Sequence, residues 1–128
     1  MRWLSAWGPV LAFEAAVLFA SSRPHLRPPQ LWPHLDKGAH FVEYSILGAL
    51  LFRAFRLSGG SRREATVLSI AFAAALAAGD EWLQSYVPGR TASLFDGLAD
   101  LAGLLAGVLI ARRFVKTHEL DPLTRNPH

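Results

Sequence analysis

A chain of 128 residues that is 52% hydrophobic and 18% charged is one domain by length, and it is too apolar for an ordinary water-soluble protein. The formal net charge of +3 does not indicate nucleic-acid binding, because the basic residues cluster at the ends of apolar segments. The absence of cysteine excludes disulfides, zinc–thiolate sites and a thiol nucleophile.

Four segments approach the roughly 17–25 mostly apolar residues that a bilayer-crossing helix needs. They cover residues 3–20, 38–55, 65–83 and 94–114. Parts of the last two are apolar on all sides and lack the polar stripe that a helix of a soluble bundle presents to water. The sequence therefore predicts an all-α fold: an integral membrane bundle of four transmembrane helices in residues 1–116, followed by a polar cytoplasmic tail at 117–128.

The first segment has two interpretations. Arg2 precedes an apolar stretch that ends in LFASS, as in a cleavable signal peptide, but Glu14 interrupts this stretch and its length exceeds a typical signal-peptide core. We favour an uncleaved first helix, in which a protonated Glu14 hydrogen-bonds inward without a partner that the sequence identifies. The proline-rich residues 21–37 that follow cannot be helical throughout and can form a partial lid over the polar ends of the other segments.

The second segment carries its polar side chains near its start. His40, Glu43 and Tyr44 have i, i+3 and i+4 spacing, which puts them on one helix face, and Lys37 precedes them. A histidine and a carboxylate so spaced can act as an acid–base pair or bind a metal. The alternative is structural: His40 hydrogen-bonds a neighbouring carboxylate, so that both groups are satisfied in a low-dielectric site.

The third segment ends in polar residues that are costly inside an apolar region. Asp80, Glu81 and Gln84 form a polar last turn, and the Pro-Gly pair at 88–89 is typical of a type II turn. Arg90 follows this turn directly, so it can fold back and pair with Glu81 or Asp96.

The fourth segment begins with Ser93 and Asp96, which have the spacing of a capping box. Asp100 lies one turn deeper on the same face. Gly103 and Gly107 continue this face with the small-xxx-small spacing that lets another helix approach closely. We expect this helix to pack through its glycines, with Asp100 pointing into the bundle.

The distribution of basic residues predicts the orientation of these segments. With the N-terminus inside, the inner pieces carry nine Lys and Arg residues and the outer pieces four, and short cytoplasmic loops carry the excess. We therefore expect a multi-pass protein of the plasma membrane with cytoplasmic N- and C-termini. The polar ends of the second, third and fourth segments then meet at the outer face.

We call the polar residues at these three segment ends the outer-face group. Acidic residues outnumber basic residues in it, so burying all of them in ionised form would cost a large amount of free energy. A hard divalent ion such as Mg²⁺ or Ca²⁺ suits an oxygen-rich ligand set, and the candidate ligands are Glu43, Asp80, Glu81 and Asp96. The candidate catalytic residues are His40, Glu43, Asp80 and Glu81. The candidate substrate-binding residues are Lys37, His40, Glu43, Tyr44, Gln84, Arg90, Asp96 and Asp100.

Two motifs in this group carry a family resemblance. Residues 36–44, DKGAHFVEY, followed by Leu47-Gly48, resemble the first signature of VanZ-like membrane proteins. The second signature is similar to the set Asp80, Glu81, Gln84, Pro88, Gly89, Arg90, Ser93, Asp96 and Gly103. The match covers about residues 36–110, and it is specific because two multi-residue motifs occur in the right order. Asp100 stands where many relatives carry Asn.

The resemblance implies a small multi-helix protein of the cell envelope, linked to tolerance of the glycopeptide teicoplanin, and it implies no particular reaction. The predicted function is binding of a cell-wall precursor, a lipid or a glycopeptide antibiotic through the outer-face group. One alternative is a membrane-embedded hydrolase or transferase for a lipid-linked substrate, with His40 or Glu43 as general base and Arg90 as a phosphate or carboxylate clamp. A weaker alternative is an ion- or proton-coupled transporter with Glu14 and Asp100 as relays.

Overall fold

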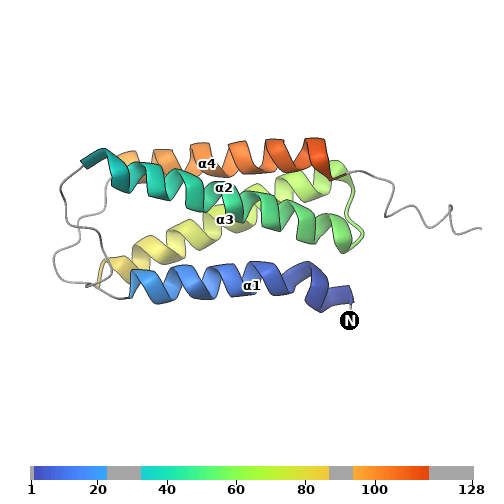
Figure 1. The fold of residues 1–128 in the computed structure, drawn as a ribbon, viewed down its shortest axis with the longest axis horizontal. Helices are drawn as coiled ribbons and strands as arrows, with labels where there is room; N and C mark the ends of the chain where they lie inside the picture. Colours follow the sequence, from blue (N-terminus) through green and yellow to red (C-terminus); the bar gives the residue numbers. More distant parts are fainter. Residues whose placement is uncertain (1, 23–32, 87–93, 116–128) are drawn as a thin grey trace, which may run out of the picture.

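The computed structural model of the chain describes residues 2–22, 33–86 and 94–115. They form four helices: α1 (Arg2–Ser21), α2 (Pro33–Leu57), α3 (Arg62–Gln84) and α4 (Leu94–Phe114). Successive helices run in opposite directions, so α2 and α4 begin at the end of the bundle where α1 and α3 finish (Figure 1). The predicted all-α fold of four helices is confirmed.

The helices have lengths that suit a bilayer. With 20 to 25 residues each and a rise of 1.5 Å per residue, they extend about 30–37 Å, close to the thickness of a hydrocarbon core. Two segments, Arg2–Ala20 in α1 and Arg62–Leu83 in α3, are long and apolar enough to cross a membrane by length and composition. The described residues of α2 and α4 do not meet the same criterion, so a bundle of four transmembrane spans stays a prediction.

The most extensive helix–helix contact joins the parallel helices α2 and α4. A Cβ atom at Gly103 would collide with the backbone carbonyl of Phe41, and a Cβ atom at Gly107 would collide with that of Ser45. Both α4 positions therefore need glycine at this helix spacing. The prediction that small residues let another helix approach α4 closely is confirmed.

Helix α2 contributes a glycine to the same contact. A Cβ atom at Gly48 would lie 2.6 Å from the carbonyl oxygen of Leu104. We call Gly48, Gly103 and Gly107 the glycine seam. Leu51, Phe52, Leu104 and Val108 are the largest fully buried apolar side chains, and all four belong to α2 or α4. In a bilayer, such close van der Waals packing is the main attraction between helices, since lipid is as apolar as the side chains.

Helix α1 docks on α2 through polar contacts near its start. Pro9 has no N–H, so the carbonyl of Ser5, four residues earlier, loses its usual helical partner. The Arg53 guanidinium donates a hydrogen bond to this carbonyl at 3.1 Å, and the Trp7 indole donates to the Ser58 hydroxyl at 3.1 Å. These two bonds set the antiparallel register of α1 against α2.

The predicted tight turn at residues 58–61 connects α2 to α3. Gly59 has φ +96°, a conformation that side-chain-bearing residues rarely adopt. The Glu64 N–H donates to the Ser61 hydroxyl at 3.2 Å, and the Ser61 N–H donates to the Glu64 carboxylate at 2.7 Å. This capping box starts α3 and was readable in the sequence as Ser-x-x-Glu. The prediction that the proline-rich loop extends to residue 37 is wrong, because α2 already begins at Pro33, where proline is tolerated in the first turn of a helix. The rest of the predicted lid at 23–32, the type II turn and the polar tail lie outside the described residues.

The glycine seam generates the first prediction. Gly107→Ala should lower the free energy of unfolding by about 1–3 kcal/mol, because the added methyl group forces two closely packed backbones apart. Thermal unfolding of the purified protein in detergent measures this change.

Gly97→Ala on the same helix is the matched control, since nothing lies within 4 Å of the position its Cβ would take. It should leave stability unchanged or raise it by up to about 1 kcal/mol, because alanine favours the helix. Equal unfolding midpoints for the two variants would contradict the claim that the contact between α2 and α4 needs glycine at position 107.

Candidate functional site

Charged residues divide between the two halves of the bundle according to their positions along the antiparallel helices. The half where α2 and α4 begin, called here the acidic half, has these described charged side chains: Glu14, Glu43, Asp80, Glu81, Asp96, Asp100 and Lys37. The opposite, basic half has these: Arg2, Arg53, Arg56, Arg62, Arg63, Arg112, Arg113 and Glu64. The predicted convergence of acidic residues from several helices is confirmed for the described part of the chain.

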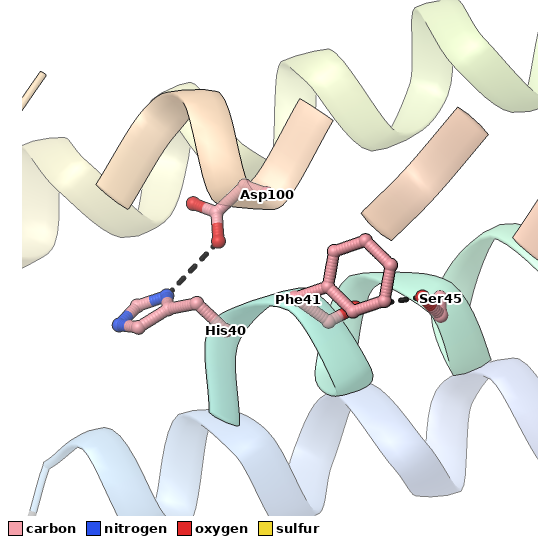
Figure 2. A network of polar contacts seen from close by, with 4 residues as sticks. All are labelled: His40, Phe41, Ser45 and Asp100. Carbon is pink, nitrogen blue, oxygen red and sulfur yellow. Dashed lines mark hydrogen bonds and ion pairs between the residues drawn. The ribbon is translucent and has the colours of Figure 1, made fainter. Parts of the chain in front are cut away.

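The centre of the acidic half is a histidine–aspartate pair between α2 and α4. Nδ1 of His40 lies 3.0 Å from Oδ1 of Asp100 (Figure 2). The two side chains are only 17% and 12% exposed. The structural interpretation of His40, a hydrogen bond to a neighbouring carboxylate, is confirmed, as is the prediction that Asp100 points into the bundle.

The glycine seam positions this pair. Gly103 follows Asp100 by three residues and lies against the carbonyl of Phe41, the residue next to His40. The same carbonyl accepts a hydrogen bond from the Ser45 hydroxyl at 2.7 Å (Figure 2). A close contact of the two backbones is therefore within one helical turn of the pair, which holds both side chains within hydrogen-bonding distance.

The pair restricts the protonation chemistry of His40. An ionised carboxylate has no hydrogen to donate, so Nδ1 of His40 must carry the proton whenever Asp100 is ionised. The neutral ring then has its lone pair on Nε2. Histidines that act as general bases are oriented in this way, with a carboxylate on one nitrogen and the reacting group at the other.

A buried tyrosine lies beside the pair and close to carboxyl groups of all four helices. Tyr44 is 5% exposed. The carboxyl groups of Asp100, Asp80, Glu43 and Glu14 all act electrostatically on its hydroxyl. Each helix thus brings one carboxyl group into the region around Tyr44, and we call these four groups with Tyr44 and His40 the polar cluster.

Glu14 joins this cluster although the sequence identified no partner for it. Asp80 and Glu43 act electrostatically on its carboxyl group. The antiparallel register of α1 against α2 brings Glu14 to the depth of Glu43. Carboxyl groups this close together cannot all be ionised at low cost unless a cation or hydrogen-bond donors compensate their charges.

The other predicted site residues are less central. Glu81 is exposed, whereas its neighbour Asp80 is half-buried, so the two acids at the end of α3 face different surroundings. Nζ of Lys37 lies 5.9 Å from the centre of the Phe95 ring, a cation–π distance that links the starts of α2 and α4. Asp96 is half-buried at the start of α4. The side chain of Gln84, and Arg90 with its predicted pairing, lie outside the described residues.

The described side chains do not assemble a metal centre. Within residues 2–22, 33–86 and 94–115, no group of three or more His, Asp or Glu residues is arranged to hold a metal ion. The candidate ligands Glu43, Asp80, Glu81 and Asp96 include one exposed residue, Glu81. The predicted Mg²⁺ or Ca²⁺ site therefore gains no support from this geometry.

Known proteins resemble the chain in sequence. The model of the VanZ/LLP1 family matches residues 6–116, which is most of the chain. An uncharacterized protein of Schizosaccharomyces pombe is 33% identical over 102 residues, covering 79% of this chain and 61% of that protein. The chain thus spans less than two thirds of the length of this relative. No solved structure matches.

Proposed function

The chain belongs to the VanZ/LLP1 family. We propose that it is a four-span membrane protein of the cell envelope and that it binds a polar ligand through the acidic half. The ligand class is a cell-wall precursor, a lipid headgroup or a glycopeptide antibiotic. A link to teicoplanin tolerance is part of the proposal.

Exposed aromatic residues at both ends of the bundle support the membrane placement. Trp3 and Phe114 are 60% and 77% exposed in the basic half, and Trp82 and Tyr86 are 63% and 70% exposed in the acidic half. Tryptophan and tyrosine gather at both membrane–water interfaces. Between these ends, α4 exposes Leu105, Leu109 and Ile110, as expected for a helix that faces lipid.

The charge asymmetry supports an orientation with the basic half at the cytoplasmic face. Arginine-rich ends of short-loop membrane proteins stay on the cytoplasmic side. Both termini are then cytoplasmic, and the acidic half lies toward the outside of the plasma membrane.

Labelling of single cysteines tests this orientation, since the natural chain has none. We expect a membrane-impermeant thiol reagent to label Gln30→Cys and Thr91→Cys in intact cells. Ser61→Cys and Thr124→Cys should react only after permeabilisation. The reverse pattern would place the polar cluster in the cytoplasm and contradict binding of an extracellular ligand.

The observation that carries the binding proposal is the gathering of one carboxyl group from each helix around Tyr44, next to the His40–Asp100 pair. Ionised carboxylates only accept hydrogen bonds and attract amines. Glycopeptides and cell-wall precursors are rich in hydroxyl, amide and amino donors. Such donors form charge-assisted hydrogen bonds with carboxylates, so a ligand of this class matches the polar cluster chemically.

Binding measurements on the purified protein in detergent test the proposal. The wild type should bind teicoplanin or a lipid-linked peptidoglycan precursor saturably. Asp100→Ala should weaken binding about tenfold or more, since a hydrogen bond to a charged group is worth about 1.5–3 kcal/mol. Glu81→Gln is the matched control because Glu81 is exposed, and it should bind like wild type. Unchanged binding by Asp100→Ala, or no saturable binding by the wild type, would contradict the proposal.

A membrane-embedded enzyme is the second candidate, and the orientation of His40 by Asp100 favours it. In this candidate, Nε2 of His40 would take a proton from water or a hydroxyl group that attacks a lipid-linked substrate. The variant His40→Ala separates the two candidates. An enzyme would lose turnover in His40→Ala while substrate affinity is largely kept, whereas a binding protein shows no turnover to lose.

A further inference from the structure

The basic half carries arginine charges that no described acid neutralises. The His40–Asp100 pair is the one ion pair formed within the described parts of the chain. Glu64, the acid that lies among the arginines, is engaged in the capping box at the start of α3. Seven arginines in this half therefore lack an acidic partner among the described side chains.

Four of these arginines gather where α3 begins and α4 ends. The Arg62 guanidinium donates a hydrogen bond to the backbone carbonyl of Arg112, which fixes the two helix ends against each other. Arg63 and Arg113 are the exposed neighbours of these two residues in sequence. Four arginines thus lie at two helix ends that contact each other, and we call these residues the arginine surface: Arg62, Arg63, Arg112 and Arg113.

Apolar surface adjoins this charge. Phe114, directly after Arg113, is 77% exposed, and Ile110 and Leu109 on the preceding turn are 55% and 58% exposed. On α3, Val67 is 58% exposed one turn beyond Arg63. A ligand with an anionic head and an apolar tail would match both parts of this surface.

We propose that the arginine surface binds the headgroup of an anionic phospholipid, with the acyl chains against the exposed apolar residues of α3 and α4. This inference rests on the membrane placement proposed above and does not depend on the ligand of the acidic half. Guanidinium groups bind phosphate in a bidentate manner, and basic residues next to a membrane surface attract anionic lipids. A free phosphate ion could bind the arginines, but it has no acyl chain to cover the exposed apolar residues beside them.

Lipid retention by the purified full chain tests this inference. The protein in zwitterionic micelles is titrated with phosphatidylglycerol or with phosphatidylcholine of the same acyl chains, and bound lipid is counted by native mass spectrometry. We expect preferential retention of phosphatidylglycerol. R63Q/R113Q should weaken it about 30-fold, from the contribution of two basic residues near the lipid. These two arginines donate no described hydrogen bonds, so the fold should survive.

R63K/R113K is the matched control because it keeps the positive charge at both positions. It should retain phosphatidylglycerol within about threefold of wild type. Equal retention of the two lipids by the wild type, unchanged retention in R63Q/R113Q, or full displacement of the lipid by excess inorganic phosphate would overturn the inference. Release of the protein from membranes by alkaline carbonate would instead contradict the membrane placement. This extraction therefore distinguishes a failure of the membrane placement from a failure of the lipid-binding inference.

Discussion

The contact between the backbones of α2 and α4 is the constraint on which the rest of this structure depends. Gly103 and Gly107 let the carbonyl groups of Phe41 and Ser45 come so close that no Cβ atom would fit between the helices. Since lipid offers no hydrophobic driving force, close packing of this kind is what can hold two helices in one register inside a membrane. The register then decides which polar side chains meet.

His40 and Asp100 meet because of this register. Helices α1 and α3 then each add a carboxyl group to the polar cluster around this pair. Helix α1, held by Arg53 and Trp7, brings Glu14, and α3 brings Asp80. The bundle therefore concentrates carboxyl groups in one half and arginines in the other. In the membrane placement that we propose, the protein would present hydrogen-bond acceptors on one side of the membrane and arginines on the other.

The sequence predicted the architecture better than the site. The length and apolar composition of the segments were enough to place four helices, and the spacing of Gly103 and Gly107 was enough to predict the close contact of α4. The spacing of residues within one helix also indicated that His40 and Tyr44 share a face. It could not show that Asp100 is the carboxylate that meets His40, or that Glu14 belongs to the polar cluster. Those contacts depend on the relative register of separate helices, which is set by features such as the Ser5 carbonyl left unpaired by Pro9.

The coupling free energy between His40 and Asp100 tests the central claim most directly. It is obtained from the unfolding free energies of wild type, His40→Ala, Asp100→Ala and the double variant. We expect about 1–3 kcal/mol in the natural background, as for a buried hydrogen bond that involves a charged group. It should fall close to zero in a Gly103→Ala background and persist in the Gly97→Ala background. The same coupling in the Gly103→Ala and natural backgrounds would show that the pair does not depend on the seam.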